Sequence, residues 1–295
     1  SRSVVGWRLQ TALTRFQVYW GASPAENVLI GAALVAVLVR RELDARYRAS
    51  FLGFFWSLLN PLLMMLVFTF VFKVLAGRSE LPAYPAFIFS GVLAWNLFAS
   101  SVTAATSSIV ENAHLIKKVY FPREVLPISV VLSNLVNYVL ALPVYFVLAT
   151  ALGQTPTIWV LLLPAIILVQ LFFTLGISFI LATVNVFYRD TQIVMEVVLL
   201  AWFFMSPVFY SISQVAPGGV RIDSLGLTLS SFDVQRWMRI LNPMASLVAA
   251  YRDVLYYGRR VGTDFLARTA VTSLAVLLVG YLVFYKYSSI FGEEV

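Results

Sequence analysis

The sequence predicts an all-α membrane protein with six transmembrane helices, an interfacial amphipathic helix before them and a re-entrant helix pair before the last span. Composition is the first reason, because 60% of the 295 residues are hydrophobic and 12% are charged, against about 25% charged residues in soluble domains. The second reason is that the apolar residues form nearly uncharged runs of membrane length, in which a helix satisfies every backbone group internally. Both observations argue against a soluble enzyme, a disordered chain and a nucleic-acid-binding domain.

The chain before the first span divides into an N-terminal extension, residues 1–25, and an amphipathic helix, residues 26–50. The extension lacks the pattern of a secretory signal peptide, because charged residues interrupt any apolar core. The apolar run 28–39 is too short to span a membrane and ends in a stretch of charged residues, so we expect the helix to lie in the cytoplasmic interface. The start of a long, bent first membrane helix is the alternative.

The transmembrane domain, residues 51–295, contains six runs with at most one charged residue each: 51–76, 85–110, 127–152, 158–188, 191–213 and 265–285. Basic residues concentrate before the first run, after the second and after the fourth. The positive-inside rule therefore places both termini in the cytoplasm. Six arginines between the fifth and sixth runs oppose this topology, but long loops follow the rule weakly.

The outer segment, residues 216–260, is predicted to contain two short helices broken at Asn242-Pro243. Proline cannot continue the first helix and suits the first turn of the second. Each helix is too short to cross, so we expect a re-entrant pair, which requires protein or a wet cavity around the broken backbone.

Several chemistries have no motif in this chain. No phosphate-binding loop of the G-x-x-x-x-G-K-[ST] type occurs, no cysteine is present, and the single histidine, His114, lies in a loop among basic residues. No ionisable residue lies in the middle of a span, which argues against ion-coupled transport. We therefore expect no metal, no cofactor and no catalytic residue in this chain.

Polar residues without charge follow single faces of the predicted spans. They favour a passage for a hydroxyl-rich substrate, and hydrogen bonding between packed helices is the alternative. Aromatic residues near span ends are candidates for stacking on sugar rings, with lipid or core contact as the alternative. The candidate channel-lining residues are Phe55, Trp56, Asn60, Trp95, Asn96, Ser100, Thr103, Ser107, Asn134, Asn137, Tyr138 and Tyr145.

Four motifs occur together in one order: 41–61 (RELDARYRASFLGFFWSLLNP), 112–127 (NAHLIKKVYFPREVLP), 185–190 (NVFYRD) and 241–243 (LNP). With them the chain resembles the type-2 ABC exporter permeases of bacterial polysaccharides and polyol phosphates, from about residue 26 to the C-terminus. The extension and an insertion at 217–233 depart from the family pattern.

The resemblance implies a half-transporter of the bacterial inner membrane. Two copies would form a channel, and two copies of a separate ATP-binding subunit would bind ATP and magnesium. It implies a coupling helix in the loop 111–127, with candidate contacts Glu111, Asn112, His114, Lys117, Lys118, Arg123 and Glu124. It also implies an outer gate at Phe232, Trp237, Asn242, Pro243 and Tyr251. A loop that only fixes the topology is the alternative for 111–127.

The function that follows is export of a polyprenyl-pyrophosphate-linked polysaccharide, either O antigen or a teichoic-acid-like polymer. Arg40, Arg41, Arg46 and Arg48 are candidates for binding the pyrophosphate, because arginine binds phosphate through two parallel hydrogen bonds. Attraction to anionic lipid headgroups is the alternative. Two other functions remain open: a membrane-embedded glycan polymerase or ligase that uses the outer segment, and a small-molecule ABC exporter permease.

Overall fold

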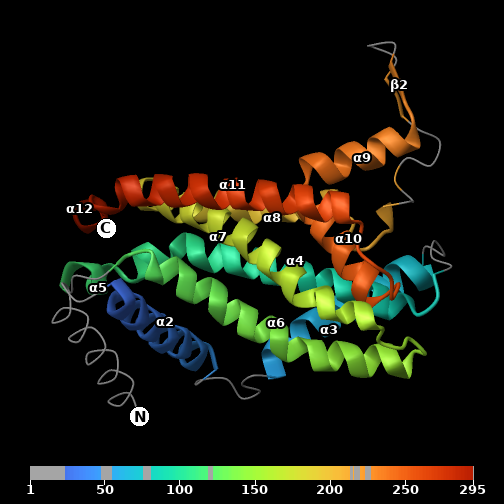
Figure 1. Ribbon diagram of the computed structural model, residues 1–295, viewed down its shortest axis with the longest axis horizontal. Coiled ribbons are helices and arrows are strands. Elements are labelled where there is room, and N and C mark those ends of the chain that lie inside the picture. Colours follow the sequence, from blue (N-terminus) through green and yellow to red (C-terminus); the bar gives the residue numbers. More distant parts are fainter. Residues whose placement is uncertain are drawn as a thin grey trace.

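The computed structural model describes residues 24–47, 55–75, 81–118, 122–212, 215, 220–222 and 227–294. This part of the chain is helical apart from one antiparallel hairpin of strands β1 (Val220–Ile222) and β2 (Leu227–Leu229). The long helices run side by side as an elongated bundle (Figure 1). One end, the α5 end, carries α5 (Ala113–Lys118) and α12 (Phe291–Glu294); the other, the α10 end, carries α9 (Ser231–Leu241) and α10 (Pro243–Leu255).

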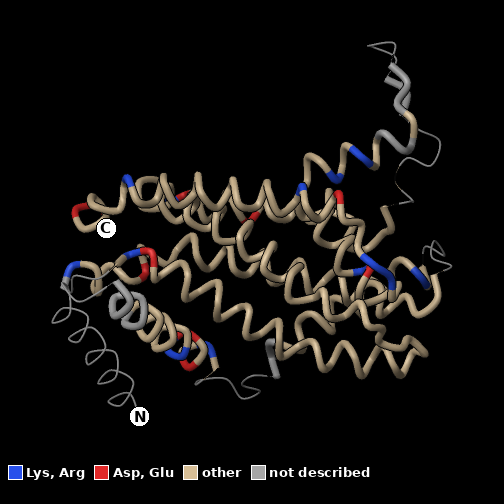
Figure 2. The backbone as a smooth tube through the Cα atoms, in the orientation of Figure 1, with Lys and Arg blue, Asp and Glu red and all other residues tan. Residues whose placement is uncertain are grey.

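Five of the described helical segments are long and apolar enough to cross a membrane. They are α3 (Phe55–Thr69) with its π-helical continuation η1 (Phe70–Leu75), α4 (Tyr84–Glu111), α6 (Val125–Ala151), the 3₁₀ turn η2 (Ile158–Leu162) with α7 (Leu163–Phe187), and α11 (Thr263–Ser288). They match five of the six runs expected from the sequence. Charged residues gather near the two ends of the bundle and on α2, and the long helices are largely uncharged between them (Figure 2).

The sixth span is not confirmed. The helix in the run 191–213 is α8 (Thr191–Met205), whose 15 residues cover about 22 Å and fall short of a hydrocarbon core of about 30 Å. Ser206 is extended at the end of α8, and Pro207 follows it. A residue before proline is driven out of the helical region, so the apolar run contains a helix end that hydropathy does not reveal.

The helix α2 (Pro24–Tyr47) agrees closely with the amphipathic helix predicted at 26–50. It lies along α6 near the α5 end (Figure 1), and Leu34 and Leu38 are buried on its inner face. Its placement in the membrane interface remains a prediction. The extension 1–23 and the segment 48–54 lie outside the described residues.

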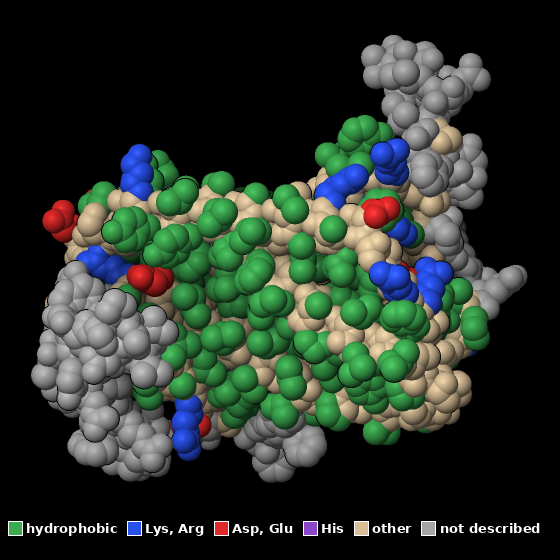
Figure 3. Space-filling view, viewed as in Figure 1, with side chains coloured by type: hydrophobic (Ala, Val, Ile, Leu, Met, Phe, Trp, Pro, Cys, Tyr) green, Lys and Arg blue, Asp and Glu red, His purple; other side chains and the backbone are tan. Residues whose placement is uncertain are grey.

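The helix α4 is the centre of the bundle and contacts α3, α6, α7, α8 and α10. In its most apolar stretch 78% of the residues are buried inside the chain, against 11% for Leu58–Leu75 and 17% for α11. Hydrophobic side chains therefore cover much of the outer face of the bundle (Figure 3). This surface faces either lipid or another protein, because an apolar surface of this extent is unstable in water.

The most extensive helix pair in the described structure is α7 with α11. Two glycines allow their close approach: a Cβ atom on Gly176 would lie 2.6 Å from the backbone nitrogen of Leu277, and one on Gly280 would overlap the carbonyl oxygen of Gly176. Small residues bring helix backbones together in membranes, where van der Waals packing replaces the hydrophobic effect as the source of helix association.

Candidate functional site

The predicted coupling segment forms a short exposed helix at the α5 end. Glu111, His114 and Lys117 are exposed there, whereas Asn112 is half-buried between α4 and α5. Arg123 and Glu124 are half-buried directly before α6, and the side chain of Lys118 lies outside the described part of the structure. The exposed polar face of α5 is therefore available to a partner.

An apolar cluster holds α5 against the rest of the bundle. Ile116 of α5 joins Leu34 of α2, Phe284 of α11 and Phe291 of α12 in this cluster, and the rings of Phe284 and Phe291 are 5.2 Å apart. The loop is thus anchored to helices from both ends of the sequence. A rigid-body movement of α5 would displace α2 and α11 as well, because packed side chains resist independent displacement.

Two of the four candidate phosphate-binding arginines make hydrogen bonds within the chain. Arg41 donates from Nη2 to Asn112 Oδ1 at 2.9 Å, and Arg46 donates from Nη1 to Asn134 Oδ1 at 2.8 Å. Tyr47 adds a bond from its hydroxyl to Asn137 Oδ1 at 2.6 Å. The end of α2 is therefore joined to the beginning of the coupling segment and to the polar face of α6.

The other two arginines differ in position: Arg40 is exposed on α2, and Arg48 lies outside the described residues. Arginines from one predicted group thus bind asparagines from two other predicted groups. Their spacing along the chain gives no signal of this pairing. Phosphate binding by these arginines remains a prediction.

The polar face predicted on the second span is open on the surface of the single chain. On α4, Ser100 is exposed and Asn96 and Thr103 are half-exposed, and no described residue gives these three side chains a hydrogen bond. Ser107, one turn further, is buried and bonds to the carbonyl oxygen of Ala104. Unbonded polar groups at membrane depth favour contact with water or with another protein over contact with lipid.

The remaining channel candidates fall into two groups. Asn60 on α3 is exposed, whereas the side chains of Phe55 and Trp56 lie outside the described part. Trp95 and Tyr138 are buried in the core of the single chain, against Phe203 and Tyr251 at ring distances of 5.5 and 5.9 Å. Tyr145 is also buried, and its hydroxyl donates to the carbonyl oxygen of Leu255 at 3.0 Å, which joins α6 to α10.

The break predicted at Asn242-Pro243 is present between α9 and α10. Asn242 caps α10, because its Oδ1 accepts from the backbone nitrogen of Ala245 at 3.2 Å. The same oxygen accepts from Trp202 Nε1 at 2.9 Å, and Nδ2 donates to Ser206 Oγ at 3.0 Å. One side chain thus holds the end of α8 against the α9–α10 corner.

The other outer-gate candidates are placed differently. Trp237 is exposed on α9, Tyr251 is buried on α10, and the side chain of Phe232 lies outside the described part. The helix α10 packs against α4, α7 and α11. A re-entrant path through the membrane is not confirmed and remains a prediction.

Arg252 of α10 is 3% exposed, in the middle of the apolar core. Its guanidinium donates to the carbonyl oxygens of Pro207, Val208 and Tyr210 and lies 3.6 Å from the ring centroid of Phe87. These bonds satisfy the backbone that leaves α8. The glycan-enzyme alternative would use Arg252 in an open catalytic site, and its burial and occupied Nη donors argue against that role.

No group of three or more His, Asp and Glu side chains in the described ranges could hold a metal ion. The described chain therefore offers an exposed helix at the α5 end, a polar face along α4 and a capped helix corner at the α10 end. The first two expose polar side chains, and the third is held by hydrogen bonds within the chain.

The chain is similar to known proteins over most of its length. The model of the family described as ABC-2 type transporter matches residues 33–222. The chain is 40% identical over 262 residues to an O-antigen export system permease protein of Myxococcus xanthus, which covers 89% of this chain and 95% of the relative. It is 32% identical over 261 residues to an O-antigen export system permease protein of Klebsiella pneumoniae, with 88% and 94% covered.

A third relative is more distant. A polysialic acid transport protein of Escherichia coli is 23% identical over 266 residues, which cover 84% of this chain and 92% of the relative. The family match contains α3 to α8, including α4 and the coupling segment with α5.

Proposed function

Because this chain belongs to the ABC-2 type transporter family, we propose that it is the membrane-spanning permease subunit of an ATP-driven exporter of a polyprenyl-pyrophosphate-linked polysaccharide. The polymer is an O antigen or a teichoic-acid-like chain, moved from the cytoplasm across the inner membrane. The observation that carries this proposal is the 40% identity to an O-antigen export permease along 89% of the chain.

The energy source is a separate ATP-binding subunit. This chain has no phosphate-binding loop of the Walker type. The exposed side chains of Glu111 at the end of α4 and of His114 and Lys117 on α5 support docking of that subunit at the α5 end. ATP and magnesium bind to the partner, and the α5 end faces the cytoplasm together with α2 and α12.

The passage is formed by two copies of the chain. Asn96, Ser100 and Thr103 lie open on α4, beside α3 and α8, and these two helices are themselves largely exposed. A second copy laid over this face removes polar groups from lipid and encloses an uncharged, hydroxyl-rich path. Such a path suits sugar hydroxyls, which exchange hydrogen bonds with serine, threonine and asparagine side chains.

The substrate lipid is recognised at α2. Phosphate oxygens are stronger acceptors for arginine than an amide oxygen, because the hydrogen bond is charge-assisted on both sides. A pyrophosphate that binds Arg41 therefore releases Asn112, which lies directly before α5. Substrate binding and the coupling helix are linked through this one hydrogen bond.

Charge reversal on α5 tests the proposed coupling. We expect Lys117→Glu to reduce co-purification of the ATP-binding subunit and surface delivery of the glycan, because it reverses the charge that α5 presents to that subunit. Lys286→Glu is the matched control: Lys286 is exposed at the same end of the molecule but lies on α11. Equal co-purification and export by Lys117→Glu and wild type would contradict a coupling role for α5.

A further inference from the structure

A cavity of about 300 Å³ lies at the α10 end, between α9, α10 and the beginning of α11. Arg239, Arg259 and Arg260 line it, and Asp253 is the one carboxylate in its lining. A second cavity of about 270 Å³ shares Arg239, Asp253 and Arg259 with the first. The lining of the first cavity therefore carries a net positive charge. None of the functional assignments above uses it.

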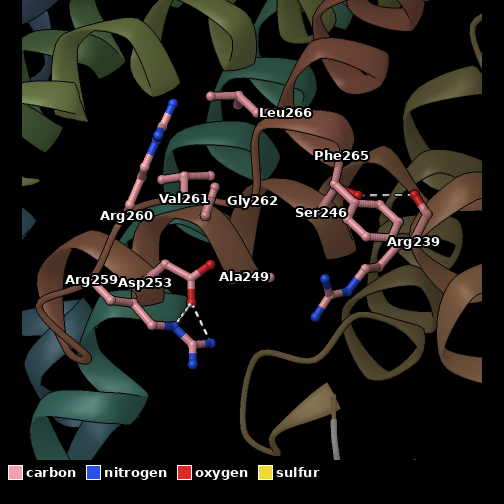
Figure 4. Close-up of a pocket in the computed structure, with 11 residues that line it drawn as sticks. Arg239, Ser246, Ala249, Asp253, Arg259, Arg260, Val261, Gly262, Phe265 and Leu266 are labelled. Atoms are coloured by element: carbon pink, nitrogen blue, oxygen red, sulfur yellow. Dashed lines mark hydrogen bonds and ion pairs between the residues drawn. The ribbon is translucent and has the colours of Figure 1, made fainter. Parts of the chain in front are cut away.

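The single carboxylate is already paired. Arg259 donates from Nε and Nη2 to the same oxygen of Asp253, Oδ1, at 2.8 and 2.7 Å. Figure 4 shows this pair on one side of the cavity and Arg239 on the other, with Ala249 between them. Asp253 thus neutralises Arg259, and Arg239 has no hydrogen bond to a carboxylate.

Arg239 is the free donor of the cavity. Its Nε atom is buried without a hydrogen-bond partner in the described structure, and its guanidinium lies 4.8 Å from the ring centroid of Phe265. Burial lowers the pKa of Arg239, and the nearby Asp253 opposes this effect. The Nη atoms of Arg239 also make no hydrogen bond in the part of the chain that the structure describes, and an oxyanion with two acceptor oxygens matches the guanidinium fork at this end.

The size and the remaining lining indicate what carries the oxyanion. Val261, Phe265 and Leu266 contribute apolar surface beside the arginines. A cavity near 300 Å³ is at the lower end of small-ligand sites, a size that suits one sugar unit. The combination suits a sugar ring that bears a negatively charged substituent.

We propose that this cavity binds the carboxylate or phosphate group of an acidic sugar unit, with Arg239 as the bidentate donor and Arg260 as further positive charge. The assignment of that sugar to the exported polymer rests on the proposed export function. Oxyanion binding itself depends only on this cavity. The cavity lies at the end of the bundle opposite α5, where an exported chain would leave.

Binding is measured on the full chain in nanodiscs of phosphatidylcholine, by microscale thermophoresis with glucuronate, inorganic phosphate and the neutral methyl glucoside. We expect wild type to bind the two anions and not the neutral sugar. Arg239→Gln should weaken anion binding by about tenfold or more, the effect of losing a charge-assisted hydrogen bond. Arg236→Gln, which removes the same charge from an exposed position of α9 outside the cavity lining, should bind as wild type.

Three results would overturn the proposal: no anion binding by wild type, equal binding by Arg239→Gln, or equal binding of methyl glucoside. If Arg239→Gln does not fold, Ala249→Glu serves instead, because it places a competing carboxylate between the arginines and should abolish anion binding. Glucuronate binding that disappears when phosphatidylglycerol is added to the nanodiscs would assign the cavity to lipid headgroups and reject the sugar.

The same samples separate the two proposals. Anion binding that persists in a chain which neither recruits an ATP-binding subunit nor exports glycan would retain the cavity and reject the proposed function. Export by a chain that binds no anion would retain the proposed function and reject the anion-binding cavity.

Discussion

At the scale of single residues, Arg252 shows how a charge is accommodated in an apolar core. Arginine has five donors and no acceptor, and here backbone carbonyls take the place of a carboxylate. Space for the guanidinium comes from Gly91, where a Cβ atom would lie 2.8 Å from Arg252 Nη2. The segment 207–210 is not helical, so its carbonyl oxygens have no helical donors and the arginine satisfies three of them.

We expect Arg252→Ala to lower the free energy of unfolding by about 3 kcal/mol, because it leaves three carbonyl oxygens without donors and opens a cavity. Thermal unfolding in detergent measures the change. Arg268→Ala, which removes an exposed arginine near the beginning of α11, is the control and should have little effect. Identical melting temperatures for the two variants would show that Arg252 is not a structural tie.

At the scale of elements, the closest helix packing described here depends on two glycines. Gly176 and Gly280 face each other across α7 and α11, and neither backbone has room for a Cβ atom from the other. Toward the α5 end, the rings of Phe179 and Phe284 meet at 5.1 Å and widen the same interface. The pair thus combines close backbone contact with aromatic packing.

Gly280→Ala should destabilise the protein, although alanine is the better helix former, because its methyl group would overlap Gly176. Gly31→Ala on α2 is the matched control, since nothing lies within 4 Å of its added Cβ atom. We expect a lower melting temperature for Gly280→Ala and an unchanged or higher one for Gly31→Ala. A stabilised Gly280→Ala variant would contradict the close contact of α7 and α11.

At the scale of the whole molecule, burial is distributed unevenly among the spans. The helix α4 is enclosed by its neighbours, whereas Leu58–Leu75, α8 and α11 present most of their side chains outward. A row of uncharged polar groups lies open on one face of α4, near two of these exposed helices. The second copy proposed above would cover part of this surface.

Cysteine cross-linking tests whether a second copy covers the polar face of α4. The natural chain is a suitable background because it contains no cysteine. Ser100→Cys should form a disulfide-linked homodimer in oxidised membranes, detected as a band of twice the mass on a non-reducing gel. Val147→Cys is equally accessible on α6, away from the polar face of α4, and should remain monomeric. Cross-linking of Val147→Cys alone would place the partner on another face.

Much of the fold and part of the candidate site were predictable from the sequence. Apolar runs with at most one charged residue located five helices that are long and apolar enough to cross a membrane, because backbone groups in lipid must be bonded within a helix. The corner at Asn242-Pro243 was predictable because proline ends one helix and begins the next. The helix end at Ser206 also precedes a proline, but it lies inside an apolar run, so hydropathy alone predicts that the helix continues.

The sequence by itself determined that this protein is a bundle of membrane-length helices, since lipid imposes helix formation on every long apolar run. Only the tertiary structure decided which helix is central and which asparagines Arg41 and Arg46 bind. It alone also shows that Arg239 faces a cavity, whereas Arg252 binds the carbonyl oxygens of the non-helical segment after α8. The physical reason is that an apolar side chain has the same hydropathy facing lipid or protein. A polar side chain likewise gives no sign along the chain of the partner that satisfies it.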